Sequence, residues 1–121
     1  MTRLVGTHTI LELYGCPGPL LGDAEFISTT LREAANHASA HLVREVVHAF
    51  VPHGVTAVAL LAESHIAIHT WPELGYAAID LFTCGVATTP HLACDYLERT
   101  LRCQHTRKQQ LERGLPPVEV S

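Results

Sequence analysis

Hydrophobic residues follow two different repeats along the chain. Alternating or continuous apolar runs, rich in β-branched residues, predict β-strands. Apolar positions three and four apart predict helices that bury one face. The expected strands cover residues 4–14, 42–51, 55–62 with an extended continuation through 65–69, and 76–83; the expected helices run from 23 to about 40 and from 90 to about 108.

The first expected helix has the clearest signals. Asp23 is placed to cap its N-terminus, and a Cys-Pro-Gly-Pro stretch just before it ends the preceding strand. Its apolar positions share one face at helical spacing. They are Ile27, Leu31, Ala34, Ala35 and Ala38.

The order of these elements is β-α-β-β-β-α. Two hairpin-like connections favour an antiparallel sheet with both helices on one face, that is, an α+β two-layer sandwich. The opposite face of such a sheet would be left uncovered by this chain. We therefore expect another molecule to cover it.

Composition narrows the class of function. The 121 residues fit one domain, 1–121. Hydrophobic residues make up 47% of the chain and charged residues 17%, which indicates a globular protein. The net charge of −4 gives no reason to expect a nucleic-acid or membrane partner. The sequence has no apolar stretch near the ~20 residues of a membrane span, and its start does not look like a signal peptide. We expect a cytoplasmic protein acting on a small molecule, with unpaired cysteines in a reducing compartment.

Reactive side chains are densest between residues 63 and 73. Ser64 and His69 are five residues apart, and we expect them to meet across a bend. If the flanking strands pair as a hairpin, Cys84 comes to the same end as Ser64. These residues alone do not exclude a Ser-His hydrolase, although no G-x-S-x-G elbow is present. A metal site at His65, His69 and Cys84 is disfavoured, because the two histidines lie in an extended segment.

The run AESHIAIHTWPELGYAAIDLFTCG, residues 62–85, resembles the signature of the bacterial and archaeal S-adenosylmethionine decarboxylases. The resemblance rests on three motifs at set spacings within this run: Glu-Ser-His, His-Thr-Trp-Pro-Glu and Phe-Thr-Cys-Gly. The likeness extends more weakly from about residue 4 to residue 113. It includes Phe50, Pro52 and Gly54.

The resemblance implies a self-processing enzyme. Ser64 would attack the Glu63 carbonyl, and the chain would break into residues 1–63 and 64–121, the second beginning with a pyruvoyl group made from Ser64. Such a ketone forms a Schiff base with a substrate amine and takes up the electrons released by decarboxylation.

The resemblance also implies roles for other residues. His69 would be the base in processing, Cys84 would return a proton to the substrate, and Thr56 would support processing. The expected substrate-binding residues are Phe50, Trp71 and Glu73. Family members work as homodimers, which would supply the missing cover for the sheet.

Two departures from the family's sequence pattern leave the identity of the substrate undecided. Thr56 stands where the family usually has a serine, and the segment from Gly15 to Pro19 lacks the usual acidic pattern. The main expectation is decarboxylation of S-adenosylmethionine, which supplies the aminopropyl donor for spermidine. The alternatives are another amino acid, such as ornithine or arginine, and a non-catalytic partner subunit.

Overall fold

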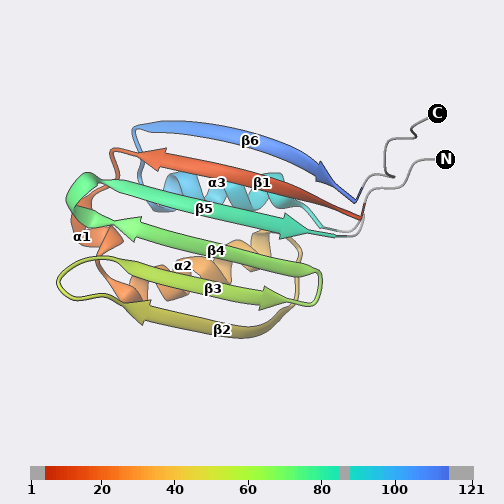
Figure 1. The fold of residues 1–121 in the computed structure, drawn as a ribbon, viewed down its shortest axis with the longest axis horizontal. Coiled ribbons are helices and arrows are strands. Elements are labelled where there is room, and N and C mark those ends of the chain that lie inside the picture. Colours follow the sequence, from red (N-terminus) through yellow and green to blue (C-terminus); the bar gives the residue numbers. More distant parts are fainter. Residues whose placement is uncertain (1–4, 85–87, 115–121) are drawn as a thin grey trace, which may run out of the picture.

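The computed structural model describes residues 5–84 and 88–114. Six strands form one antiparallel sheet in the order β2-β3-β4-β5-β1-β6 (Figure 1). The strands are β1 (Gly6–Tyr14), β2 (Leu42–Ala49), β3 (Val55–Leu61), β4 (Ser64–Trp71), β5 (Tyr76–Thr83) and β6 (His105–Arg113). The predicted α+β class and antiparallel sheet are confirmed.

The helices lie on one side of this sheet (Figure 1). They are α1 (Gly18–Leu21), α2 (Ala24–His37) and α3 (Pro90–Thr100), and a short 3-10 turn η1 (Pro72–Leu74) links β4 to β5. Asp23 caps α2 as predicted, because its side chain accepts a hydrogen bond from the Phe26 amide at 3.1 Å. Within the described residues, no helix is long and apolar enough to cross a membrane.

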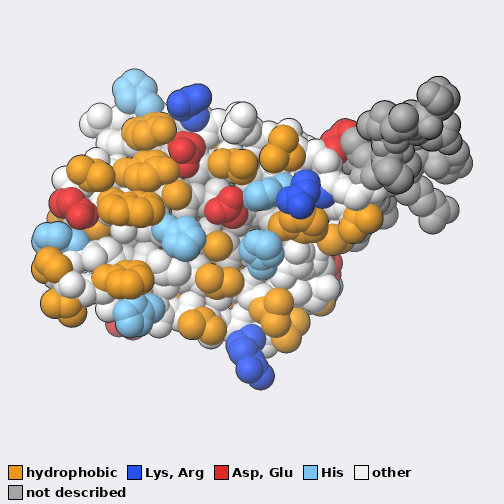
Figure 2. Space-filling view, viewed as in Figure 1, with side chains coloured by type: hydrophobic (Ala, Val, Ile, Leu, Met, Phe, Trp, Pro, Cys, Tyr) orange, Lys and Arg blue, Asp and Glu red, His pale blue; other side chains and the backbone are white. Residues whose placement is uncertain are grey.

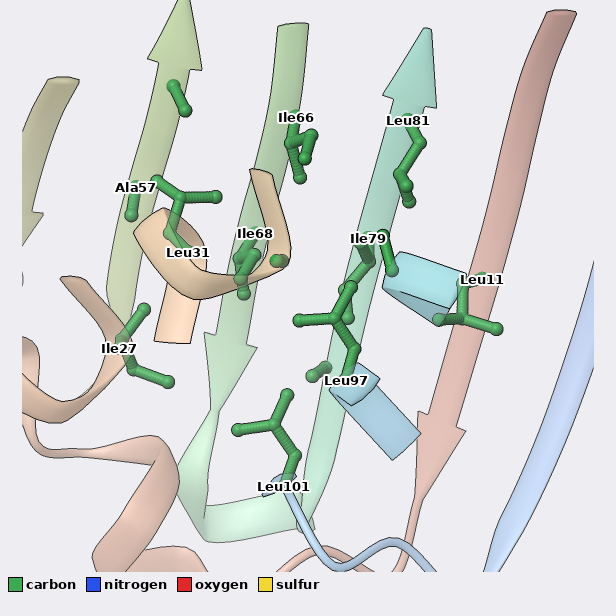
Figure 3. Close-up of a cluster of buried hydrophobic side chains, with 14 of the residues drawn as sticks. Leu11, Ile27, Leu31, Ala57, Ile66, Ile68, Ile79, Leu81, Leu97 and Leu101 are labelled. Atoms are coloured by element: carbon green, nitrogen blue, oxygen red, sulfur yellow. The ribbon is translucent and has the colours of Figure 1, made fainter. Parts of the chain in front are cut away.

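The core lies between the sheet and α2 with α3 (Figure 3). Along each of the inner strands every second side chain points to the helices and is buried. All five predicted apolar positions of α2 and its C-terminal end belong to this core. Its largest members include Leu11, Leu31, Ile66, Ile68, Ile79, Leu81 and Leu97.

No helix of the described residues covers the opposite side of the sheet, which we call the open face (Figure 1). Figure 2 shows hydrophobic and histidine side chains spread across it. Val46 of β2 pairs with Val58 of β3, and their exposed fractions are 62% and 36%. Leu60 beside them is 50% exposed. Among residues 5–84 and 88–114, the expectation that one apolar face of the sheet is left uncovered is therefore met.

Three elements differ from the sequence prediction. Residues 55–69 form two strands joined by a tight turn at Ala62 and Glu63, so β3 and β4 are a hairpin. The second helix ends at Thr100 rather than near residue 108, and β6 follows, because β1 offers it a hydrogen-bonding edge. The short helix α1 was not predicted; it begins within the Cys-Pro-Gly-Pro stretch that was predicted only to end the first strand.

We predict that Leu31→Ala lowers the free energy of unfolding by about 2–5 kcal/mol, because a fully buried side chain leaves a cavity. Urea denaturation followed by circular dichroism measures this. Glu33→Ala, on the exposed side of the same helix, is the control and should change stability by less than about 0.5 kcal/mol. Equal effects of the two substitutions would contradict the assignment of the core.

Candidate active site

Ser64 begins β4 directly after the two-residue turn from β3. The turn pairs Leu61 with Ser64 across the hairpin. The backbone of Ser64 has a φ of 147°, a conformation that residues with a side chain rarely adopt. Such a backbone costs about 1–3 kcal/mol and is kept only where the surroundings hold it. The peptide bond between Glu63 and Ser64 is therefore placed on a strained, tightly held turn.

The end of β5 lies beside this turn. Ser64 is opposite Thr83 in the β4–β5 ladder, and the backbone amide of Cys84 donates a hydrogen bond to the Glu63 carbonyl oxygen at 3.0 Å. Gly6 of β1 makes room for this arrangement, since a Cβ there would lie 3.2 Å from the Cys84 sulfur and 2.7 Å from the Thr83 oxygen. The prediction that Cys84 comes to the same end as Ser64 is confirmed.

The side chain of Glu63 is held by His41, a residue that sequence reasoning did not single out. Glu63 Oε1 accepts a hydrogen bond from the His41 amide at 3.0 Å, and Oε2 lies 2.8 Å from His41 Nδ1. The backbone hydrogen bond, followed by the side-chain one, lowers the pKa of the Glu63 carboxyl. The carboxylate is thus fixed in its charged form beside the turn.

His69 lies elsewhere on the strand, and the expectation that it meets Ser64 is wrong within one chain. The two residues are on one continuous strand, so five steps separate them by roughly 17 Å. His69 instead pairs with Thr56 of β3, whose hydroxyl is 3.0 Å from His69 Nδ1. The imidazole next to Ser64 is that of His65, with Nδ1 3.5 Å from the serine oxygen.

His69 and Thr56 line a cavity of about 360 Å³ at the far end of β4. All three residues predicted to bind substrate line it too. The complete lining is Phe50, His53, Gly54, Thr56, His69, Thr70, Trp71 and Glu73. The cavity combines two aromatic rings, a carboxylate and two imidazoles.

The floor of this cavity is fixed by a buried hydroxyl. Thr70 Oγ1 donates to the Leu21 carbonyl at 2.8 Å and accepts from the Val55 amide at 2.9 Å. Gly54 has a φ of 99°, and a Cβ there would lie 2.9 Å from the Thr70 carbonyl oxygen, so only glycine fits. Sequence reasoning noted Gly54 but missed Thr70 and His53.

The predicted residues therefore form two groups at opposite ends of β4. We call Glu63, Ser64 and Cys84 the cleavage group, and the lining of the 360 Å³ space the cavity group. Figure 1 shows that these ends, the β3–β4 turn and η1, lie at opposite sides of the sheet. Among residues 5–84 and 88–114 no cluster of three or more His, Cys, Asp or Glu side chains could hold a metal ion.

Comparison with known proteins assigns the family. The family model described as S-adenosylmethionine decarboxylase matches residues 7–114. This chain belongs to the S-adenosylmethionine decarboxylase family. The match includes every residue of the cleavage and cavity groups.

Individual members of the family align along nearly the whole chain. The S-adenosylmethionine decarboxylase proenzyme of Parasynechococcus marenigrum is 51% identical over 113 residues, covering 93% of this chain and 88% of its own. That of Caldicellulosiruptor saccharolyticus is 44% identical over 119 residues, covering 97% and 96%. The crystal structure of the adenosylmethionine decarboxylase of Aquifex aeolicus has a TM-score of 0.88 at 37% identity, covering 98% of both chains.

The contacts with His41 predict the pH behaviour of Glu63. A lowered folded-state pKa means that this carboxylate stabilises the fold above the ordinary glutamate pKa, and the contribution is lost as pH falls through the folded value. Carboxyl ¹³C NMR of a Ser64→Ala chain should give a lower midpoint for Glu63 in the folded than in the urea-unfolded protein. His41→Ala should reduce this difference only in part, because the backbone amide remains. Equal folded and unfolded midpoints would contradict the hydrogen bonds.

Proposed function

We propose that this chain is a self-processing, pyruvoyl-dependent decarboxylase of S-adenosylmethionine, supplying the aminopropyl donor for spermidine. The observation that carries the proposal is the placement of the Glu63–Ser64 bond on a strained turn beside Cys84, in a chain that belongs to this family. A non-catalytic partner subunit would not need to keep these residues together. The four cysteines are unpaired, which fits a reducing compartment, and the proposal places the enzyme in the cytoplasm.

Self-cleavage follows from the chemistry of the turn. The Ser64 hydroxyl oxygen attacks the Glu63 carbonyl carbon, the amide C–N bond breaks, and an ester forms with a free amine at Ser64. The Cys84 amide already donates to the carbonyl oxygen on which negative charge develops, so it stabilises that charge without rearrangement. The unfavourable φ of Ser64 favours the step, because breaking the amide frees the Ser64 backbone from that conformation.

The second step opens the chain. A base removes the Ser64 α-proton, and the electrons expel Glu63 as a carboxylate and leave dehydroalanine. Tautomerisation and addition of water then release ammonia and leave the pyruvoyl group on residues 64–121. When formed, this group supplies an electron sink for decarboxylation. The Cys84 thiol would lie beside it and can return a proton to the substrate carbon.

His69 cannot be the base that removes the Ser64 α-proton within its own chain, because the two residues are roughly 17 Å apart. We propose that it serves Ser64 of a second copy, in a homodimer that packs open face against open face. The exposed pair of Val46 and Val58 with Leu60 offers apolar surface for such a contact. In a two-fold dimer each cavity group then completes the cleavage group of the partner. Thr56 orients the imidazole through its 3.0 Å contact with Nδ1.

The cavity group suits a nucleoside with a positive charge. Phe50 and Trp71, which are 50% and 40% exposed, offer ring faces for stacking on adenine or for contact with a sulfonium ion. The Glu73 carboxylate can accept hydrogen bonds from both ribose hydroxyls. These features favour S-adenosylmethionine over ornithine or arginine.

Mass spectrometry of the purified protein under denaturing conditions tests the first part of the proposal. We expect two fragments, 1–63 and 64–121, with the second carrying pyruvate in place of Ser64. Ser64→Ala, which lacks the attacking oxygen, should remain one chain. A wild-type chain that stays whole after prolonged incubation would refute self-processing by this protein alone.

Release of carbon dioxide from carboxyl-labelled substrates tests the second part. We expect turnover of S-adenosylmethionine and none of ornithine or arginine above the Ser64→Ala background. Glu73→Gln should raise KM for S-adenosylmethionine about 10- to 100-fold with a smaller change in kcat, because a charged hydrogen-bond acceptor is lost. Preferred turnover of ornithine or arginine would leave the cofactor proposal intact and replace the substrate.

Mixing two inactive chains tests the shared site. Ser64→Ala and His69→Ala should each stay uncut alone. When the two are co-expressed, random pairing should yield cleavage of about half of the His69→Ala chains, since a mixed dimer has one complete site. The Ser64→Ala chains should remain whole. No cleavage in the mixture, with mixed dimers present by native mass spectrometry, would place all processing residues within one protomer.

A further inference from the structure

His41 makes three contacts with the turn that contains the cleavage bond. It lies between α2 and β2, 22 residues before Glu63. Its amide and its Nδ1 atom hold the two oxygens of the Glu63 carboxylate at 3.0 and 2.8 Å, and its carbonyl accepts the Ala62 amide at 2.8 Å. The Glu63 side chain is consequently only 23% exposed, although it stands on a hairpin turn.

Glu63 is therefore anchored from two sides. Its carboxylate is held from the β2 side by His41, and its carbonyl oxygen is held from the β5 side by the Cys84 amide at 3.0 Å. Between these anchors is the acyl group that Ser64 must attack. A two-residue turn without such anchors could rotate its peptide planes and relieve the positive φ at Ser64.

We propose that His41 is a positioning residue for self-cleavage: its hold on the Glu63 carboxylate keeps the Glu63 carbonyl against the Cys84 amide and within reach of the Ser64 hydroxyl. This inference rests on the self-processing proposed above. Fixing the reacting groups in one arrangement raises the fraction of chains ready to react. The neutral Nδ1–H tautomer and the charged imidazole both donate to the carboxylate, so the hold does not require a protonated ring.

The role is limited to cleavage. Once the Glu63–Ser64 bond is broken, Glu63 ends the first fragment and is no longer attached to the residue that becomes the pyruvoyl group. Loss of the His41 side chain should therefore slow the formation of active sites and leave the turnover of each formed site unchanged. A residue that only supports the fold would affect both steps and the melting temperature.

The test follows cleavage of the full chain after cell-free synthesis, by intact mass over time. We expect His41→Ala to cleave on the order of fivefold more slowly than wild type, the effect of losing one solvent-accessible charged hydrogen bond. His41→Asn should restore most of the rate, because its side-chain amide nitrogen occupies the place of Nδ1. His91→Ala, at an exposed histidine of α3, is the matched control and should cleave like wild type.

Carbon dioxide release per pyruvoyl group, measured after cleavage is complete, should be equal in all four proteins. Cleavage of His41→Ala at the wild-type rate would overturn the inference. Equal slowing in His41→Ala and His41→Asn, with lower turnover per site or a lower melting temperature, would also overturn it and leave a structural role. A wild-type chain that never cleaves would instead refute the proposed self-processing, and this inference with it.

Discussion

The position of β4 between β3 and β5 is the constraint on which the rest of the structure depends. Its two ladders set Ser64 opposite Thr83 and His69 opposite Thr56. Side chains alternate along it, so Ile66 and Ile68 enter the core while the imidazoles face away from the helices. A slip of one residue would exchange these sets and bury the polar imidazole rings. The strand register that places the isoleucines in the core therefore also sets the positions of Ser64 and His69.

One-sided coverage of the sheet has a second effect. The open face combines exposed apolar side chains with polar pairs such as His8 and Asp80, whose Nε2 and Oδ1 atoms are 3.0 Å apart. A surface of this kind is unfavourable in water on its own, and association would bury it. In the proposed homodimer, association and completion of the site would use this same surface. A chain of 121 residues can in this way build a larger site than one sheet provides.

Some features could be predicted from the sequence because local signals carry them. Asp23 and the helical spacing after it identified α2, and the hairpin argument placed Cys84 near Ser64. The turn between β3 and β4 was missed, because Ala62 and Glu63 are not the glycine or asparagine that usually mark two-residue turns.

Other features depend on contacts between distant residues. The first residues of β6, 105–108, were predicted to be helical and the rest of the strand was not predicted, because an edge strand that is exposed on both faces lacks a clear apolar alternation. The separation of Ser64 from His69 depends on the strand being straight, which spacing alone does not determine. The contact of His41 with Glu63 joins positions 22 apart and has no local signal.

The strand order gives the proposed cut a lasting consequence. The first fragment would contain β1, β2 and β3, and the second β4, β5 and β6. In the sheet order β2-β3-β4-β5-β1-β6, β1 is inserted between two strands of the second fragment. Neither fragment holds a contiguous sheet, so folding must precede cutting. A cut molecule that unfolds would have to reassemble from two separate chains, each with unpaired edges open to aggregation. Cleavage would thus convert a single chain that can refold into a two-chain molecule that is stable only as long as it does not unfold.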